Sequence, residues 1–461
     1  MKFDIIVLGS GPGGYVTAIR AAQLGFNTAI IEKENLGGVC LNWGCIPTKA
    51  LLKSAQVFDY IKHADQYGVL AEAPKADFTA MVQRSRGVAE SMSKGVAFLM
   101  RKNNITVLNG FGKLLPQKQV EVTNDEGSKI YSADHIIIAT GARAGQLPNL
   151  PIDGKKVIDY RKAMTLDKQP ESMIVVGSGA IGVEFAYFYN TIGTKVTIVE
   201  YLSNIVPRED IEVSKQLGRS FKKSKIKVMT SSELLSVDTS GDKVKAIVNT
   251  KKGEVELEAD IILSAVGIKA NIENIGLEEV GIQTEKGKIA VDDFYRTNID
   301  GYYAIGDVLA TPALAHVASA EGITCVEKIA GHNPEKIDYT NIPGATYTSP
   351  EISSTGMTEQ EAIDAGHDIL VGKFPFTASG KAKAAGHAEG FVKIIIDKKY
   401  GEILGAHMIG ANVTEMIAEI VSARKAEATG HTILKAIHPH PTMSEAIMEA
   451  VAAAYDEVIH L

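Results

Sequence analysis

Two of the chain's three cysteines, Cys40 and Cys45, lie five positions apart, directly after Gly37-Gly38. A thiol pair at this spacing suits chemistry that moves two electrons by making and breaking a disulfide. Pro47 favours the first turn of a helix, so we expect Cys45 at a helix N-terminus. The partial positive charge there favours a thiolate. Lys49 would share a helical face with Cys45 and add positive potential.

Half of a zinc site and a structural disulfide are the alternative uses of such a pair. Zinc requires further cysteine or histidine ligands at similar spacing, and the chain has no second pair, so we expect no metal site. A structural disulfide is unexpected in a chain without a secretion signal. The sequence therefore favours a redox-active pair. Cys325, the remaining cysteine, falls in a helical run and is expected to be a buried, small apolar residue.

A second candidate group is the run His438-Pro-His440-Pro-Thr-Met-Ser-Glu445. Glu445 follows His440 by five residues, and we expect a helix to begin near Ser444, so the acid can reach the imidazole. A carboxylate on one ring nitrogen fixes the tautomer and raises the basicity of the other nitrogen, as a thiol's base requires. Surface histidines beside an ordinary capped helix are the alternative, and the sequence does not show that this pair meets Cys40.

The elements that position these residues include one long-range repeat. A glycine pattern, GxGxxG, occurs twice, 168 residues apart, each time between an apolar strand and a helix-compatible run. In both copies an acid closes the next strand, 18 residues after the third glycine. The glycines and acids are Gly9, Gly11, Gly14 and Glu32 in the first copy, and Gly177, Gly179, Gly182 and Glu200 in the second.

Both copies have the pattern of a dinucleotide-binding unit. The first glycine makes a tight turn, the second admits a pyrophosphate at the helix N-terminus, and the third lets helix and strand pack closely. The acid accepts hydrogen bonds from an adenosine ribose. Ordinary strand–helix turns are the alternative, but a duplicated strand–turn–helix–strand–acid pattern predicts two such units.

The rest of the chain predicts how these units are completed. Residues 50–104 are mostly helical, and strands are expected near 105–111, 117–123 and 128–138, the last one opening into a turn at Thr140-Gly141. A matching strand and turn ends at Gly267, and the first unit resumes at residues 301–307. That strand places Asp307 at the edge where such sheets bind ligands; a helix N-cap is its alternative role.

From about residue 341 the pattern changes to an α+β domain without a nucleotide fingerprint. Strands are expected near 369–376, 391–397 and 402–409, and helices near 412–428, 431–437 and 443–455. We expect this domain to contact a second subunit or a substrate.

Composition narrows the function classes. The chain has 461 residues, 45% of them apolar and 22% charged, which is typical of a globular protein of several domains. The net charge of −7 argues against nucleic-acid binding, and no apolar run is long enough to span a membrane. The N-terminus enters a strand at once, leaving no room for a signal peptide. We therefore expect a cytoplasmic protein, with a processed organellar protein as the alternative.

Together these motifs resemble the pyridine nucleotide–disulfide oxidoreductases, over essentially the full chain. The resemblance rests on both GxGxxG patterns, on GGVCLNWGCIPTK around the cysteines, on ATG at Thr140, on AIGD at Asp307 and on HPTMSE at His440. It implies an α/β fold with two Rossmann-like domains, for FAD and NAD, and a C-terminal α+β dimerisation domain. The implied domains are an FAD-binding domain (first part, 1–143), an NAD-binding domain (144–268), a central domain completing the FAD site (269–340) and the interface domain (341–461).

The resemblance also implies roles for individual residues. Cys45 would contact the flavin and Cys40 would exchange with substrate, while His440, oriented by Glu445, would be the base supplied from the other subunit of a homodimer. Glu184 would lie beside the nicotinamide and Lys49; an ordinary acid near a helix N-terminus is its alternative. The implied FAD site includes Gly9, Gly11, Gly14, Glu32, Lys49, Gly112, Thr140, Gly141, Asp307 and Ala315. The implied NAD site includes Gly177, Gly179, Gly182, Glu184, Glu200 and Gly267.

The branch of the family that the chain is most similar to oxidises dihydrolipoamide carried by lipoyl domains of 2-oxo-acid dehydrogenase or glycine cleavage complexes. NADP-dependent relatives such as glutathione reductase need cations near the second acid, whereas Glu200 is followed by Tyr-Leu-Ser-Asn. Mercuric and larger thioredoxin reductases carry a C-terminal cysteine pair, which this chain lacks. A non-catalytic scaffold would lack one of the four reactive residues. One departure from the family pattern is Ile268-Lys-Ala-Asn271, in place of Arg and Pro before Asn.

Trp43, the only tryptophan, lies between the two cysteines and predicts a redox-sensitive fluorescence. Reduction of the pair is expected to change the emission of the protein, whereas a Cys40→Ser variant, which cannot form the disulfide, should show no such change. A fluorescence titration with a reductant measures both. An unchanged emission of the unmodified protein on reduction would argue that this loop is not the redox centre.

Overall fold

The first glycine-rich turn belongs to a sheet with a parallel core. In the computed structural model, which describes residues 2–461, β1 (Lys2–Leu8) lies between β2 (Thr28–Glu32) and β6 (Gly127–Ile138). β3 (Thr106–Asn109) extends the sheet beyond β2, and β19 (Tyr302–Ala304) pairs in parallel with β6. The pairing of β19 confirms that the first unit resumes after residue 300. The apolar run Ile136 to Ile138 is fully buried, as expected of a strand covered on both faces.

An antiparallel meander completes this sheet. β4 (Phe111–Leu115) and β5 (Gln119–Asn124) pair with each other and, through β5, with the first half of β6. The strand expected near 105–111 is present as β3 but ends earlier than expected, because the chain bends at Gly110 with a φ of +147°. A Cβ at this position would lie 2.6 Å from the carbonyl oxygen of Thr123, so only glycine fits and the chain divides into β3 and β4.

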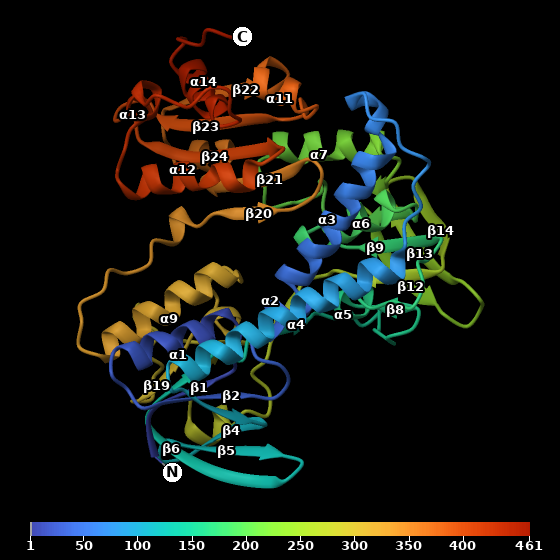
Figure 1. Ribbon diagram of the computed structural model, residues 1–461. Helices are drawn as coiled ribbons and strands as arrows, with labels where there is room; N and C mark the ends of the chain where they lie inside the picture. Colours follow the sequence, from blue (N-terminus) through green and yellow to red (C-terminus); the bar gives the residue numbers. More distant parts are fainter. Residues whose placement is uncertain (1) are drawn as a thin grey trace.

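Helices cover the sheet and connect it to the rest of the molecule (Figure 1). α1 (Pro12–Gln23) packs against α9 (Ala315–Ile329), and α3 (Cys45–Lys62) packs against α4 (Phe78–Lys102). The short α2 (Gly38–Trp43) carries Cys40 and leads directly into α3. α3 begins at Cys45, which confirms the expected position of this thiol at a helix N-terminus. Cys325 of α9 is fully buried, also as expected.

The second glycine-rich turn belongs to a five-stranded parallel sheet. Its strand order is β11-β10-β9-β15-β8, and an antiparallel sheet of β12, β13 and β14, which the sequence did not predict, lies beside it. The strands are β8 (Val157–Ile158), β9 (Ser172–Val176), β10 (Lys195–Val199), β11 (Lys227–Met229), β12 (Glu233–Asp238), β13 (Val244–Thr250), β14 (Gly253–Ala259) and β15 (Ile261–Ser264). The helices of this unit are α5 (Tyr160–Ala163), α6 (Ala180–Thr191) and α7 (Ile211–Lys223).

Five short elements belong to the two chain segments that link the sheets. β7 (Ala142–Ala144) pairs antiparallel with β16 (Ile268–Ala270), and the hairpin of β17 (Thr284–Glu285) and β18 (Lys288–Ile289) follows α8 (Leu277–Val280). The β7–β16 pair places Gly141 beside Asn271 and Gly267 beside Gly145, where backbone N–H groups of Asn271 and Gly145 donate to the two glycine carbonyl oxygens at 2.9 and 2.8 Å.

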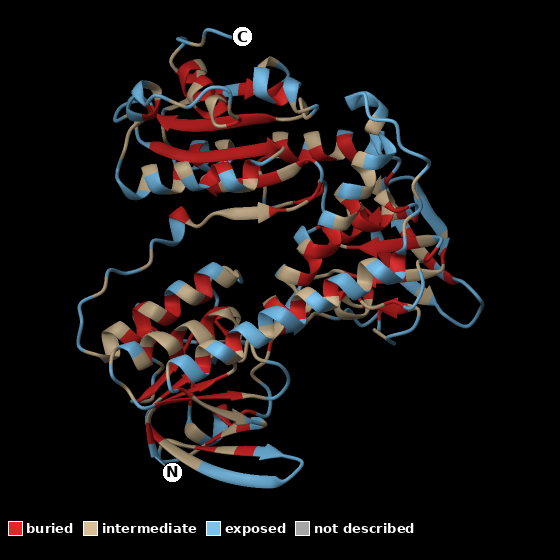
Figure 2. Ribbon diagram, viewed as in Figure 1, coloured by how far each residue is buried: buried red, intermediate tan, exposed pale blue. Residues whose placement is uncertain are grey.

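The C-terminal part is an antiparallel sheet of order β20-β21-β24-β23-β22 with helices packed on it. Every residue of β23 and β24 is buried, so these strands run through the middle of the layer (Figure 2). The expected meander is confirmed, and the α/β class with two nucleotide-binding sheets and a C-terminal α+β part is correct. The strands are β20 (Gly344–Thr346), β21 (Glu351–Gly356), β22 (Ile369–Pro375), β23 (Phe391–Asp397) and β24 (Ile403–Gly410). The helices are α10 (Glu359–Asp364), α11 (Gly380–Ala384), α12 (Val413–Lys425), α13 (Gly430–Lys435) and α14 (Glu445–Ala454).

A buried ion cluster joins this sheet to the second nucleotide unit. Lys393 of β23 is fully buried, and its Nζ lies 3.0 Å from Asp210, 3.0 Å from Glu212 and 2.6 Å from Glu359. Asp210 also caps α7 by accepting a hydrogen bond from the Glu212 N–H at 2.9 Å. The two parts are therefore held together in part by the Lys393–Asp210 pair, both of whose side chains are buried and weakly screened by water.

No helix within residues 2–461 combines the length and the apolar character needed to cross a membrane.

Removing the buried cation is expected to destabilise the protein. Lys393→Met leaves the carboxylates of the cluster without their shared partner, and loss of one partner of a buried ion pair costs about 3–5 kcal/mol. Lys373→Met is the matched control, because Lys373 lies opposite Lys393 on the neighbouring strand β22 and pairs with Glu212 of α7, but its side chain is 41% exposed; such a pair contributes about 0–1 kcal/mol. Urea unfolding measures both variants, and equal losses would contradict the argument.

Candidate active site

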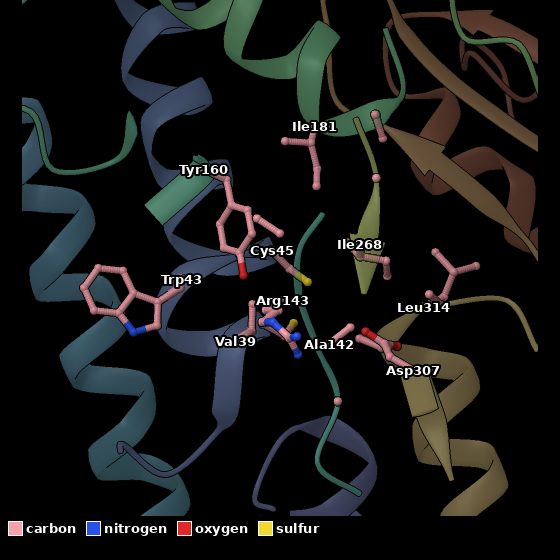
Figure 3. A pocket seen from close by; sticks show the side chains of 18 of the residues that line it. Val39, Trp43, Cys45, Ala142, Arg143, Tyr160, Ile181, Ile268, Asp307 and Leu314 are labelled. Atoms are coloured by element: carbon pink, nitrogen blue, oxygen red, sulfur yellow. The ribbon is translucent and has the colours of Figure 1, made fainter. Parts of the chain in front are cut away.

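A cavity of ≈ 2250 Å³ lies where the two nucleotide units and the C-terminal part meet. Its volume exceeds the roughly 300–1,000 Å³ of a typical small-molecule pocket, so it has room for more than one large ligand. Figure 3 shows Cys45 and Tyr160 on one side of the cavity and Asp307 and Leu314 on the other.

The two glycine-rich turns have the same backbone geometry. Gly9 and Gly177 have φ values of +104° and +97°, and a Cβ on them would lie 2.3 and 2.4 Å from a backbone oxygen. A Cβ on Gly14 or Gly182 would lie 1.9 or 2.1 Å from the carbonyl oxygen of the first glycine. Only glycine fits at these four positions, so both helices start directly against their strands.

The middle glycine of each turn opens toward the cavity. A Cβ on Gly11 or Gly179 would meet no atom within 4 Å, and both residues line the cavity. Each is the N-cap of the following helix, α1 or α6, and offers no side chain to the first helical N–H groups. Those donors are left for a ligand, and the positive end of the helix favours an anion such as a pyrophosphate. The turns therefore fit the phosphates of two dinucleotides.

The two acids are also held in the same way. Glu32 accepts hydrogen bonds from the N–H and Oγ of Ser10 at 3.1 and 2.5 Å, and Glu200 accepts the equivalent bonds from Ser178 at 2.8 and 2.6 Å. Each carboxylate keeps lone pairs for further donors such as ribose hydroxyls. Within residues 2–461 the Glu200 carboxylate forms no ion pair, and its hydrogen-bond donors are Ser178 and the N–H of Leu202.

The two thiols lie within hydrogen-bonding reach of each other on the cavity wall. Both are free in this structure. The hydrogen bond from Cys40 lowers the pKa of Cys45, burial opposes it, and the Lys49 ammonium adds to the lowering, which brings this pKa to about 7. The same hydrogen bond, burial and the charge on Cys45 raise the pKa of Cys40. Cys45 is therefore the thiol that carries the negative charge, as its position at a helix N-terminus predicts.

An ion pair connects the two nucleotide units beside the thiols. The Nζ of Lys49, on α3, lies 2.9 and 2.8 Å from the two carboxylate oxygens of Glu184, on α6. Glu184 is buried, with only 5% of its side chain exposed, so the carboxylate of the pair is shielded from water. The proximity of Glu184 to Lys49 that the family resemblance implies is therefore present.

The opposite wall carries Gly112, Asp307 and Ala315. Asp307 caps no α-helix, because α9 begins only at Ala315, so the N-cap interpretation is wrong. Burial raises the pKa of the Asp307 carboxyl, although Lys288 opposes this shift. Lys288 also donates a hydrogen bond of 2.5 Å from Nζ to the carbonyl oxygen of Asp307, a contact that the sequence did not suggest. A Cβ on Gly112 would lie 2.2 Å from Cδ1 of Leu8, so a larger residue there would require the Leu8 side chain to move.

Thr140, Gly141 and Gly267 line the cavity at opposite ends of the β7–β16 pair. The Thr140 hydroxyl donates to the carbonyl oxygen of Asn271 at 2.7 Å, and the Asn271 amide donates to the carbonyl oxygen of Thr140 at 3.0 Å. The Thr140 hydroxyl thus links the end of β6 to the segment that follows β16. Asn271, at the end of the segment that departs from the family pattern, is its partner in both hydrogen bonds.

His440 and Glu445 lie outside this cavity. Nδ1 of His440 is 2.8 Å from Oε1 of Glu445, and the Thr442 N–H donates to Oε2 at 2.8 Å. Burial alone would raise the pKa of Glu445, but the hydrogen bonds from Thr442 and His440 lower it, so this acid is ionised. With Nδ1 donating to the carboxylate, Nε2 is left as the basic nitrogen. The His440 side chain is 80% exposed, and a single chain does not bring it to Cys40.

The sequence did not suggest the surroundings of Trp43. The guanidinium groups of Arg86, on α4, and Arg161, on α5, lie 4.2 and 5.3 Å from the centre of its ring. Arg161 also pairs with Glu34 at 3.0 Å. The indole at the end of α2 is thus held between cations from two other helices, and no local pattern in the sequence indicates these partners.

Comparison with known proteins agrees with this geometry. Residues 3–322 match a family described as pyridine nucleotide-disulphide oxidoreductase, and residues 342–451 match the dimerisation domain of that family. Dihydrolipoyl dehydrogenases of Rhizobium etli and Bacillus subtilis are 47% and 44% identical to the chain, over 100% of its length and 99% of theirs. A mitochondrial dihydrolipoyl dehydrogenase of Arabidopsis thaliana is 42% identical, over 99% of the chain and 91% of the relative.

Solved structures show the same fold. LpdA from Mycobacterium tuberculosis superposes with a TM-score of 0.91 at 26% identity, covering 97% of this chain and 99% of that one. The flavoprotein disulfide reductase RclA from Escherichia coli superposes with a TM-score of 0.89, also at 26% identity, covering 98% and 99%.

The two thiols are expected to titrate separately in the reduced protein. Cys45 should be alkylated by iodoacetamide with a midpoint near pH 7, because its pKa is lowered to about 7, and Cys40 only at higher pH. Lys49→Met removes a positive charge and should raise the Cys45 midpoint. Residue-resolved mass spectrometry of alkylation over a pH series measures this. A Cys45 midpoint near the ordinary value of about 8.5, or Cys40 reacting first, would contradict the assignment.

Proposed function

The chain belongs to the pyridine nucleotide–disulphide oxidoreductase family, and we propose that it oxidises protein-bound dihydrolipoamide to lipoamide with reduction of NAD+ to NADH, the activity of a dihydrolipoyl dehydrogenase. The observation that carries this proposal is the thiol pair: Cys40 and Cys45 lie on the wall of a cavity that two dinucleotide fingerprints share. The full-length similarity to dihydrolipoyl dehydrogenases supports the choice of substrate.

The residues of the cavity fit two cofactors. The first unit would hold FAD through the turn at Gly9–Gly14, Glu32, Asp307 and the start of α9 at Ala315, and the second would hold NAD through the turn at Gly177–Gly182 and Glu200. Bound FAD and NAD+ supply the two-electron acceptors that the thiol pair itself lacks. Lys49 and Glu184 would hold a fixed charge pair where the two cofactors approach each other.

The protein's own residues carry out the sulfur chemistry. One thiol of dihydrolipoamide attacks Cys40 of the oxidised pair, forming a mixed disulfide and releasing Cys45 as a thiolate. The second substrate thiol then attacks the mixed disulfide, which releases lipoamide and leaves Cys40 reduced. Two electrons thus enter the pair. The low pKa of Cys45 makes it the better leaving group and stabilises its charge after release.

In this proposal, His440 takes up the proton of the attacking substrate thiol. Nε2 of His440 accepts it, and Glu445 orients the ring and stabilises the imidazolium that forms. Because a single chain does not bring His440 to its own cavity, we propose that each cavity receives His440 from the second subunit. The match to the family's dimerisation domain supports a homodimer.

Partners and location follow from the same proposal. The substrate would be a lipoyl domain of a 2-oxo-acid dehydrogenase or glycine cleavage complex, and the location cytoplasmic. We propose domain boundaries at residues 143, 268 and 340, supported by the sheets to which the flanking strands belong.

Another NAD(P)H-dependent disulfide reductase, such as a glutathione reductase-like enzyme, is the second candidate. The similarity of fold to RclA, a disulfide reductase, is the observation that favours it. The environment of Glu200 argues against an NADP-dependent version, because the carboxylate repels a 2′-phosphate and no cation pairs with it within residues 2–461.

A steady-state assay distinguishes these candidates. The enzyme should turn over lipoamide with NADH and leave oxidised glutathione unreduced. The value of kcat/KM for NADH should exceed that for NADPH by at least about tenfold, because of the charge on Glu200. Glu200→Gln is the control for charge and should narrow the preference. Rapid glutathione reduction would favour the second candidate, and equal use of both coenzymes would contradict the assignment of the second site.

A further inference from the structure

Three parts of the chain meet at the Lys49–Glu184 ion pair. Lys49 comes from α3 of the first nucleotide unit and Glu184 from α6 of the second. The third participant is Tyr347, the residue directly after β20 in the C-terminal part. All three residues line the cavity that also contains Cys45.

Tyr347 contacts both members of the pair. Its backbone N–H donates to Oε1 of Glu184 at 2.9 Å. Its ring lies below the ammonium of Lys49, with Nζ 4.4 Å from the ring centre. Oε1 of Glu184 therefore accepts two hydrogen bonds, from Lys49 and from Tyr347, and the ammonium lies between a carboxylate and an aromatic face.

This arrangement restricts a flexible side chain. Lysine has a long side chain with many rotamers, and the Lys49 side chain is 33% exposed toward the cavity. With Glu184 as its only contact, the ammonium could therefore take several positions around the carboxylate. An aromatic face attracts a cation through the negative charge above the ring, and thereby closes off the other side. The Tyr347 ring is itself fixed, because it packs against the apolar core of the second unit.

We propose that Tyr347 is a positioning residue that holds the Lys49 ammonium in place on the Cys45 side of the cavity. Tyr347 acts through Lys49, whose charge favours the thiolate form of Cys45. The proposal deepens the proposed function, since it assigns a residue to the same site, but it concerns a property of the protein that can be measured without the substrate.

The ionisation of Cys45 depends on the groups that face it. They are the Cys40 thiol from α2, Lys49 from its own helix, Glu184 from α6 and the Tyr347 hydroxyl from the C-terminal part. Lys49 is the only cation among them. The position of its ammonium therefore determines how strongly the Lys49–Glu184 pair favours the thiolate form of Cys45. Displacing the ammonium leaves Glu184, which disfavours the thiolate.

The experiment compares variants that differ only in the ring. Tyr347→Leu keeps the backbone N–H and removes the aromatic face, whereas Tyr347→Phe keeps both and is the matched control. The readout is the pH midpoint of Cys45 alkylation in the reduced, FAD-loaded protein, resolved by mass spectrometry. We expect Tyr347→Leu to raise the midpoint by about 0.5 pH unit, about a threefold loss of thiolate below the midpoint, and Tyr347→Phe to leave it unchanged.

A size-matched variant answers the same question if Tyr347→Leu does not fold. Tyr347→pentafluorophenylalanine has nearly the volume of phenylalanine but reverses the charge distribution of the ring, so it should raise the midpoint relative to Tyr347→Phe. Unchanged midpoints in the leucine and fluorinated variants, or a shift in Tyr347→Phe as large as theirs, would overturn the proposal.

The two experiments distinguish a failure of the proposed function from a failure of the proposed role of Tyr347. If the protein does not oxidise dihydrolipoamide, the lipoamide assay is negative while the Cys45 midpoints still respond to the ring at position 347. If Tyr347 does not position Lys49, the midpoints stay fixed while lipoamide turnover is retained.

Discussion

The Lys49–Glu184 ion pair lies beside Cys45, where three parts of the chain meet, and the arrangement of these parts depends on it. Cys45 lies at the start of α3, accepts a hydrogen bond from Cys40 and faces the Lys49 ammonium, and these contacts bring its pKa to about 7. A buried carboxylate, Glu184, balances the lysine from the other nucleotide unit. A charge at this depth must be paired, because its desolvation is not otherwise compensated. The two sheets are therefore fixed relative to each other by the same ion pair that supports the thiolate.

Further contacts attach the second unit to the other parts of the chain. The cluster around Lys393 attaches α7 of the second unit to the C-terminal sheet, and the Lys49–Glu184 pair attaches α6 to α3 of the first unit. The second unit is thus attached to both other parts of the chain, which suits a site whose two ligands must approach each other closely.

Features that depend on neighbouring residues were predictable from the sequence. The glycine-rich turns, the acids Glu32 and Glu200 and the helix start at Cys45 follow from spacing and backbone sterics within one strand–turn–helix segment. The pairing of His440 with Glu445 was likewise local, and the structure contains it.

Features that depend on contacts between distant segments were not predictable. Tyr347 reaches Lys49 only because the C-terminal sheet is folded against both units, and the arginines around Trp43 come from α4 and α5. The division of one expected strand at Gly110 arises from a contact with Thr123 on a neighbouring strand. Single-sequence patterns carry no information on such partners, because each residue type is ordinary in its own segment.

The matched geometry of the two glycine turns has an evolutionary consequence. In both, a methyl group on the first or third glycine would overlap a backbone oxygen, and a serine in the turn holds the acid at the end of the second strand. If the two halves descend from one ancestral gene that was copied in tandem, sterically frozen positions of this kind are the ones that retain the common signature. The helices and loops around these positions could then diverge to bind different ligands. Evidence of the common ancestor would remain at the positions where only glycine fits.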